Sequence, residues 1–344
     1  NWEYKKQYNT RMNSLIGTAD FYSSNLKKLG YTAWDVIANL EPMQKQWGKE
    51  NGLKLKDYEW NLAYKNGFVP WMIKKKTHWM YEILKSQIKA FKPDIIYSMA
   101  IETIDNTFLD SVKGYYRIAI GQHAASLNHK NISKYNLILS SLPNQVEYFK
   151  KLGLNSKYFK LGFEPKILDL INKGKKKYDL TFIGGFGKHF IKSNALIEKL
   201  LRKFDFNIWG YSDKHNSSSI IDQNLNGVLY GKEMYQVLAG SKIIFNRHAD
   251  FAESYANNMR LYQGTGMGSL LITDSKDNLS DIFQVGKEVV DYSSVDECVE
   301  KIDYYYNHEE ERESIAKNGQ KRCIEDHSWY NRMEELNQIV KKII

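Results

Sequence analysis

The sequence contains very little cysteine and no long hydrophobic run. Only Cys298 and Cys323 occur in 344 residues, too few for a disulfide framework or a cysteine-based metal site. No uninterrupted apolar stretch approaches the ~18–20 residues that a membrane-spanning helix needs. The chain begins Asn1-Trp2-Glu3, with neither an initiator methionine nor the basic-then-apolar pattern of a signal peptide. We therefore expect a trimmed N-terminus and a reducing, cytoplasmic compartment.

Several catalytic signatures are also missing from the sequence. It has no Asp-x-Asp pair that could hold a metal–nucleotide complex, no cluster of histidine and cysteine ligands, and no Gly-x-Ser-x-Gly nucleophile elbow. Its one glycine cluster after a predicted strand fits neither the Gly-x-Gly-x-x-Gly fingerprint nor the Walker pattern. These absences predict an enzyme or binding protein without a catalytic metal or a bound cofactor.

The composition is that of a globular, basic protein. With 42% hydrophobic residues the chain can build cores, and its length suggests two domains. The net charge of +9 favours anionic partners such as nucleotides, phosphorylated lipids, an acidic membrane surface or nucleic acid. Nucleic acid is the least favoured, because clustered basic stripes with interleaved aromatic residues are not prominent.

Short apolar runs alternate with helix-length intervals along most of the chain. In the first half, this pattern predicts helices over 20–29 and 79–91, and strands over 33–38, 95–97, 116–120 and 137–139. After a lysine-rich stretch it restarts, with strands over 180–183, 206–209, 242–246, 269–273 and 289–290. Helices are predicted over 194–204, 233–239, from 259, and over 295–306, 309–322 and 329–343. The alternation predicts an α/β fold of two parallel sheets covered by helices, with ligands at the carboxyl ends of the strands.

The strongest candidate site combines a strand end with a helix start. Arg247 and His248 follow the predicted strand 242–246, which places a cation at its carboxyl end. The run Asn257-Asn258-Met259-Arg260-Leu261-Tyr262-Gln263 has the form of a helix that begins with an asparagine cap. A helix N-terminus with two nearby arginines is suited to bind a diphosphate.

Weaker candidates occupy other strand ends. Gly184 and Gly185 follow the strand 180–183 and could let the backbone approach a phosphate, or could simply form a tight turn. Trp209 and Gly210 end the next strand, where the indole could border a base or sugar pocket or belong to the core.

Two polar residues in the first half of the chain could also take part. His123 follows the strand 116–120 and could serve as a base or hydrogen-bond donor, or as a satisfied structural histidine. Asp20 opens the first predicted helix, either as its N-cap or as a site residue.

The segment from Asn257 to Asp274 (NNMRLYQGTGMGSLLITD) resembles the GT-B glycosyltransferases, specifically the CgeB-like branch of the group 1 families. The same family is also matched by Asp20-Phe21-Tyr22-Ser23, Gly121-Gln122-His123, 178–185, 276–283, 286–290 and 302–320. The resemblance runs from about residue 17 to residue 340 and so covers nearly the whole chain.

The resemblance implies two Rossmann-like domains that face each other across a cleft. An acceptor-side domain would comprise residues 1–162, a nucleotide-sugar-binding domain 163–327, and a last helix, about 328–344, would pack back on the first domain. The donor, by default a UDP-sugar, would meet Gly184, Gly185, Trp209, Gly210, Arg247, His248, Asn257, Asn258, Met259, Arg260 and Gln263. His123, Asp20 and Arg247 would be catalytic, and cationic side chains in place of a metal would neutralise the leaving diphosphate.

The resemblance has one departure within its most specific motif. Members of the branch usually carry glutamate where this chain has Gln263, and eight residues earlier stands Tyr255 where an acid is expected, with Glu253 the nearest one. This departure leaves open a catalytically weakened module that binds a glycan or nucleotide without turnover. A GT-B-like sugar-nucleotide epimerase is a further alternative.

The leading hypothesis is a bacterial, metal-independent, retaining glycosyltransferase of cell-envelope glycan biosynthesis. Its acceptor would be a glycan, a lipid-linked molecule or a protein. The enzyme would be cytoplasmic, with peripheral contact to the anionic inner face of the membrane as a further expectation.

Overall fold

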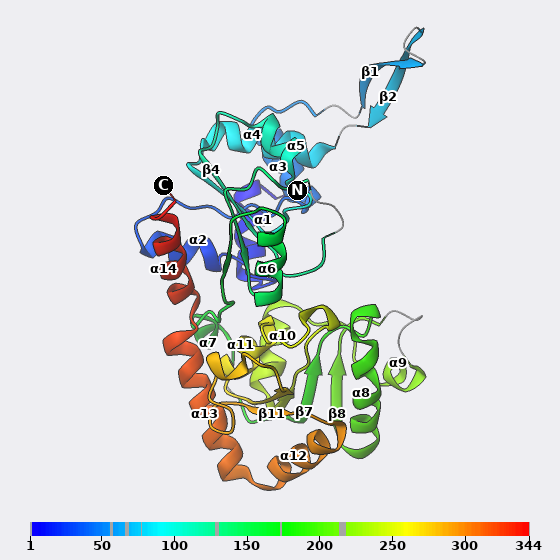
Figure 1. Cartoon of the computed structure of the whole chain (residues 1–344), viewed down its shortest axis with the longest axis vertical. Coiled ribbons are helices and arrows are strands. Elements are labelled where there is room, and N and C mark those ends of the chain that lie inside the picture. Colours follow the sequence, from blue (N-terminus) through cyan, green and yellow to red (C-terminus); the bar gives the residue numbers. More distant parts are fainter. Residues whose placement is uncertain are drawn as a thin grey trace. The chain divides into compact units, whose positions relative to one another are not determined.

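The computed structural model describes residues 2–55, 58–65, 69–76, 78–127, 131–172, 174–212 and 218–343 (Figure 1). The chain divides into two compact units. Unit 1 comprises residues 1–13, 35–123 and 127–138, and unit 2 comprises 14–34, 124–126 and 139–344. The predicted functional boundary between residues 162 and 163 stays a prediction. None of the helices in the described ranges is both long enough and apolar enough to span a membrane.

The first sheet has four short strands in the order β3-β4-β5-β6. Its strands are β3 (Ile95–Ser98), β4 (Ile118–Gln122), β5 (Leu137–Ser140) and β6 (Ser156–Tyr158). β3 and β4 pair in parallel from Ile95 opposite Ile118, and β5 is buried along its whole length. Continuous apolar runs such as Leu137-Ile138-Leu139 are typical of parallel strands covered on both faces.

The helices of the first half are α1 (Tyr4–Asn13), α2 (Phe21–Lys28), α3 (Glu41–Glu50), α4 (Trp79–Phe91), α5 (Asn106–Ser111) and α6 (Pro143–Lys151). The helix predicted over 79–91 is confirmed to the residue, because apolar side chains three and four positions apart bury one face. It ends at Phe91, and the C-cap residue Lys92, just before Pro93, has a left-handed φ of 46°.

The second sheet lies entirely in unit 2 and has five parallel strands in the order β11-β10-β9-β7-β8. Its strands are β7 (Tyr178–Ile183), β8 (Phe206–Trp209), β9 (Ser241–Phe245), β10 (Leu270–Asp274) and β11 (Val290–Tyr292). The chain passes from β7 to β8 on one side and returns to β9 on the other. The carboxyl ends of β7 and β9 therefore form a topological switch point, where open α/β sheets bind ligands.

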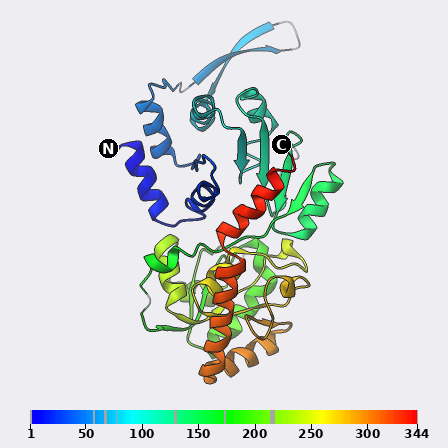
Figure 2. The same ribbon diagram turned by 90° about the vertical axis from the view of Figure 1, so that its left-hand side faces the viewer.

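The helices that precede, connect and follow these strands are α7 (Ile167–Leu170), α8 (Ile191–Lys203), α9 (Ser219–Asn224), α10 (Gly231–Ala239), α11 (Met259–Gly266), α12 (Val295–Asn307), α13 (Glu309–Asp326) and α14 (Trp329–Val340). The strands contribute fully buried side chains such as Leu180, Ile243 and Leu270 to one core. In Figure 2 α13 and α14, orange to red, follow one another at the end of the chain. α14 packs against α2 within unit 2, where the Tyr22 and Trp329 rings lie 4.7 Å apart.

Two parts of the first half differ from the prediction. The strand predicted over 33–38 is wrong, because residues 31–37 have no regular structure there. Trp34 and Val36 are exposed, so the apolar alternation does not mark a buried sheet position. The antiparallel hairpin of β1 (Tyr58–Lys65) and β2 (Val69–Lys76) was not predicted at all.

Candidate nucleotide-sugar site

The candidate site lies at the switch point of the five-stranded sheet. The turn at Gly184 and Gly185 leaves the carboxyl end of β7, and Arg247 follows the carboxyl end of its neighbour β9. α11 begins at Met259, and its third residue, Leu261, is buried in the core. The fold thus brings together the residues predicted to bind a diphosphate, although their role stays a prediction.

Arg260, on the first turn of α11, is half-buried as a residue, but nitrogen atoms of its guanidinium group are fully buried. One terminal nitrogen donates to the carbonyl oxygen of Ile183 at 3.2 Å and lies 3.5 Å from the sulfur of Met234. The other terminal nitrogen and Nε are buried without a hydrogen-bond partner in the described structure. Burial lowers the pKa of Arg260 to about 10, and among the described residues no carboxylate forms an ion pair with it. Its positive charge is therefore not neutralised by the protein.

Arg247 is buried, with only 3% of its surface exposed, but it is extensively bonded. One terminal nitrogen donates to Ser193 Oγ at 2.8 Å and Asn194 Oδ1 at 2.9 Å, and the other to Gly185 O at 2.9 Å. Three rings lie within 5.4 Å of the guanidinium carbon: Phe182, Phe186 and Phe190. Burial lowers its pKa to about 10. Arg247 therefore fixes the glycine turn to the start of α8, and only its Nε is left without a partner in the described ranges.

Asn258 is the N-cap of α11, as the sequence predicted. Its side-chain oxygen accepts from the backbone N–H of Leu261 at 3.1 Å, and its amide nitrogen donates to Arg247 O at 3.0 Å. Asn257 is buried and accepts a hydrogen bond from Tyr262 Oη at 3.0 Å. The cap therefore ties the helix start to the end of β9, and the first backbone N–H groups of α11 stay at the carboxyl edge of the sheet.

His248 forms a pair with Asp274, a residue that the sequence did not single out. The carboxylate accepts from His248 Nδ1 at 2.7 Å and from the His248 backbone N–H at 3.1 Å. Burial by itself would raise the pKa of Asp274, but the bond from His248 and the charge of Lys276 lower it. Asp274 ends β10, the strand beside β9, and this adjacency could have been inferred from the predicted strand order.

Gln263 does not lie free at the surface, because it is 6% exposed and donates through Nε2 to Tyr235 Oη at 3.2 Å. Tyr235 belongs to α10, and burial raises the pKa of its hydroxyl to about 12. The hydrogen bond between Gln263 and Tyr235 therefore joins α11 to α10. The expected contact of Gln263 with a ribose stays a prediction.

The turn after β8 approaches the glycine turn closely. Gly184 N donates to Trp209 O at 3.0 Å, and Gly210 has a φ of +154°. A β-carbon on Gly210 would lie 1.7 Å from Gly184 O, so only glycine fits there. Trp209 itself is buried, with 7% of its surface exposed, as expected for a core side chain.

The two candidates from the first half of the chain lie in different units. Asp20 belongs to unit 2, where its carboxylate pairs with Lys166 Nζ at 2.6 Å. It occupies the N-cap position of α2, but its side chain makes no capping hydrogen bond there. His123 belongs to unit 1 and directly follows β4. Their catalytic roles stay predictions.

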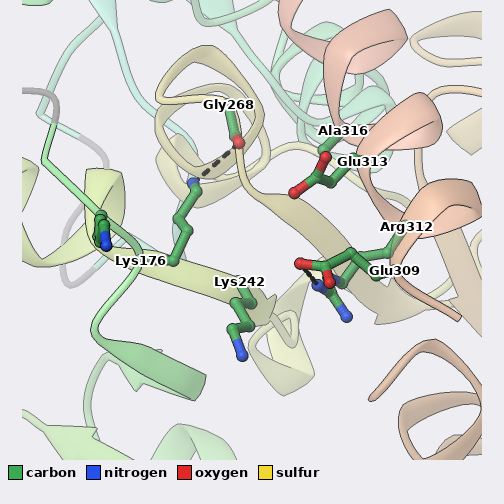
Figure 3. Close-up of a pocket in the computed structure, with 8 residues that line it drawn as sticks. Lys176, Lys242, Gly268, Glu309, Arg312, Glu313 and Ala316 are labelled. Atoms are coloured by element: carbon green, nitrogen blue, oxygen red, sulfur yellow. Dashed lines mark hydrogen bonds and ion pairs between the residues drawn. The ribbon is translucent and has the colours of Figure 1, made fainter. Parts of the chain in front are cut away.

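A separate hollow of about 260 Å³ lies at the opposite, amino edge of the same sheet (Figure 3). Its lining includes Lys176 just before β7, Lys242 in β9 and Gly268 just before β10. Lys176 Nζ donates to Gly268 O at 3.0 Å, and burial lowers its pKa to about 8. None of the predicted site residues lines this hollow. Within the described part of the chain, no three His, Cys, Asp or Glu residues are grouped so that they could hold a metal ion.

Comparison with known proteins gives a family match over part of the chain and a fold for most of it. Residues 192–338 match the family model described as Glycosyl transferase-like. No curated protein matches the chain in sequence. A glycosyltransferase from Rickettsia africae is similar in structure, with a TM-score of 0.57 at 12% identity over 94% of this chain and 93% of that one.

Two further solved structures have the same architecture. Anabaena Alr3699/HepE in complex with UDP and glucose has a TM-score of 0.56 at 10% identity, over 76% of this chain and 81% of that one. Sucrose-phosphate synthase from Thermosynechococcus elongatus has a TM-score of 0.53 at 9% identity, over 77% and 79%. These likenesses, together with the two parallel sheets, confirm the expected GT-B fold.

Proposed function

We propose that the chain is a glycosyltransferase that transfers a sugar from a nucleoside diphosphate sugar, by default a UDP-sugar, because residues 192–338 match the Glycosyl transferase-like family model and the chain has the GT-B fold. The acceptor is a glycan, a lipid-linked molecule or a protein, and the anomeric configuration is retained. The reaction needs no metal. The donor binds at the carboxyl edge of the five-stranded sheet in unit 2.

The observation that carries this proposal is the pair of buried guanidinium groups at the switch point. Taking a charge out of water costs several kcal/mol unless a counter-charge or hydrogen bonds compensate it. Arg247 has neutral hydrogen-bond partners, and Arg260 has a single carbonyl and a thioether. A protein-bound anion at this turn would compensate both charges. The diphosphate of a sugar nucleotide has the required charge.

The same groups suit the chemistry of sugar transfer. As the bond between the sugar and the diphosphate breaks, negative charge grows on the leaving oxygen. Preorganised cations and backbone N–H groups stabilise such charge without reorganisation. Here Arg260 and the N-terminus of α11 would provide this stabilisation, and Arg247 would hold the Gly185 turn against them.

The choice of UDP as the first donor follows from a neighbour. The Alr3699/HepE structure contains UDP and glucose. At 10% identity this likeness supports UDP only as the first probe. The net charge of +9 supports a further element of the proposal, that the enzyme works in the cytoplasm and contacts the anionic face of the membrane when its acceptor is lipid-linked.

His123 would act in acid–base catalysis, and Asp20 would assist as a further catalytic residue. Neither has a role in holding the diphosphate in this proposal. The pairing of Asp20 with Lys166 would keep its carboxylate oriented.

The test begins with thermal-shift measurements on the wild-type chain with UDP-, GDP-, ADP- and TDP-sugars in the presence of EDTA. Any nucleotide sugar that raises the melting temperature is then assayed for hydrolysis and for transfer. The proposal expects at least one stabilising donor and turnover without added metal. Absence of binding to all four classes would contradict it.

Gln263 supports one second candidate, a module that binds the nucleotide sugar without turnover. Its neutral amide donates to Tyr235 and brings no negative charge to the site. Tight donor binding with no hydrolysis or transfer across a panel of acceptors would favour this candidate.

A further inference from the structure

Tyr211 is an exposed aromatic residue that no part of the proposed mechanism has used so far. It follows Gly210 directly beyond the end of β8, and 61% of its surface is exposed. Its neighbour Trp209, two residues earlier, is buried in the core. Of the two aromatic side chains at this strand end, Tyr211 is therefore the one that a ligand can reach.

The Tyr211 ring lies against the glycine turn that follows β7. A β-carbon on Gly185 would come within 3.0 Å of both Cζ and Oη of Tyr211, so the ring rests on the backbone of this glycine. The backbone of Tyr211 is held there as well, because its carbonyl oxygen accepts from Phe186 N at 3.1 Å. The absence of a side chain at position 185 leaves room for this contact.

The backbone that precedes Tyr211 is also fixed. Gly210 N donates to Gly227 O at 2.8 Å, and Gly184 N donates to Trp209 O at 3.0 Å. The two turns after β7 and β8 are therefore bonded to each other over several residues. A ring on such a backbone is preorganised, and binding to it costs little conformational entropy.

The buried cations lie at the same turn. Arg247 donates to the carbonyl oxygen of Gly185, and Arg260 donates to that of Ile183. The three-residue turn 183–185 thus has an exposed aromatic ring on it and two guanidinium groups bonded to it. A nucleoside diphosphate has the matching chemistry, since it joins a planar base to a doubly charged anion through one ribose.

We infer that Tyr211 is the residue on which the base of the nucleoside diphosphate stacks. This inference rests on the proposed function and adds a base-recognition residue to it. Stacking on an aromatic face tolerates any base, because every base has a π-face. Tyr211 therefore contributes affinity for the nucleoside, and selection among bases depends on other contacts.

The test compares UDP with inorganic pyrophosphate, which has the anion but no base, by calorimetry on wild-type, Tyr211→Ala and Tyr211→Phe chains. If the wild-type chain prefers GDP, ADP or TDP, that nucleotide replaces UDP. Tyr211→Ala should weaken nucleotide binding at least about fivefold, the low end of what one base–aromatic stack contributes. Pyrophosphate binding should change less than twofold. Tyr211→Phe keeps the aromatic face and should bind the nucleotide within about twofold of wild type.

The matched control is Tyr304→Ala, which removes another exposed tyrosine, on α12, and should leave nucleotide binding unchanged. Equal nucleotide affinity in wild type and Tyr211→Ala would overturn the stacking while the proposed function stands. Parallel loss of nucleotide and pyrophosphate binding would also overturn it, because Tyr211 would then support only the turn. A loss confined to the UDP-sugar, with UDP unaffected, would assign the ring to the sugar instead. Failure of the wild-type chain to bind any of the four nucleotides would count against the proposed function itself.

Discussion

The guanidinium of Arg260 donates to the carbonyl oxygen of Ile183 at 3.2 Å, so a cation on the first turn of α11 lies against the end of β7. The bond joins the two elements that form the switch point. Its acceptor is neutral, and the charge of Arg260 has no carboxylate partner among the described residues. The bond between Arg260 and Ile183 therefore leaves the positive charge of Arg260 available to an external anion.

Arg260→Met is expected to separate stability from binding. Methionine fills a similar volume next to Met234, and the change removes a buried charge that the protein does not neutralise. The free energy of unfolding without ligand should stay equal or rise. Affinity for the diphosphate should fall tenfold or more, measured by calorimetry beside urea denaturation.

Arg322→Met is the matched control for this prediction. Arg322 lies on α13 and forms an ion pair with Asp326 one turn away. Its replacement should leave nucleotide affinity unchanged. If Arg260→Met bound UDP as tightly as wild type, Arg260 would have no part in diphosphate recognition.

Arg247→Ala is expected to lower both binding and stability. The variant leaves Ser193, Asn194 and the carbonyl of Gly185 without the bonds that they now accept. Unsatisfied buried acceptors cost ~1–3 kcal/mol each, in part offset because a buried charge is removed. We expect the free energy of unfolding to fall by about 2 kcal/mol and nucleotide binding to weaken tenfold or more.

Arg247→Lys keeps the charge but cannot reach all three acceptors, because lysine lacks the planar fork of arginine. It should recover part of the binding and little of the stability. Unchanged affinities of Arg247→Ala for UDP, GDP, ADP and TDP would refute the assignment of Arg247 to the site.

The contrast between the two arginines shows what sequence reasoning could and could not reach. The strand ends and the start of α11 follow from apolar periodicity and from the asparagine cap, so the meeting of Arg247, Asn258 and Arg260 was predictable. The different bonding of the two arginines was not. Ser193 and Asn194 lie more than 50 residues from Arg247, and only the folded sheet brings α8 beside it.

The aromatic residue at the end of β8 could not be chosen from sequence either. Trp209 and Tyr211 flank a glycine whose φ of +154° is available to glycine and not to other residues. This turn, and not the alternation of a strand, decides which ring faces the core. In the first half, the alternation over 33–38 resembles a strand, but its side chains at Trp34 and Val36 are exposed.

The buried His327 predicts a pH-dependent stability. Its Nε2 donates to Ile282 O at 2.7 Å, and burial lowers its pKa to about 4. An unfolded histidine titrates near ~6.5, so between these values the unfolded chain binds more protons than the folded one. The stability that the neutral, buried His327 contributes is fully present above pH 6.5. As the pH falls towards 4, the free energy of unfolding loses this contribution of about 3 kcal/mol.

His327→Gln tests this expectation, since glutamine can still donate to Ile282 O but does not titrate. Urea denaturation at pH 7 and pH 5 should show a smaller decrease for this variant than for wild type. His308→Gln, at an exposed position on the boundary of α12 and α13, should show the same decrease in the free energy of unfolding as wild type. An equal decrease in wild type and His327→Gln would rule out His327 as the cause of the pH dependence.

His123→Ala is expected to lower turnover without affecting nucleotide binding. If His123 transfers a proton during the reaction, its loss should reduce kcat by ~10²-fold or more. It has no diphosphate contact in the proposed mechanism, so the Kd for UDP should stay within about twofold. Loss of both quantities, or of neither, would contradict this division of roles.

The most direct test of the central claim is a calorimetric titration of the wild-type chain, in EDTA, with matched nucleoside diphosphates and monophosphates. Two buried cations and a helix N-terminus predict that the diphosphate of at least one base binds tenfold or more tightly than its monophosphate. This preference should persist without metal and disappear in Arg260→Met. Equal affinity for the two phosphates, or binding that appears only with added magnesium or manganese, would contradict the account.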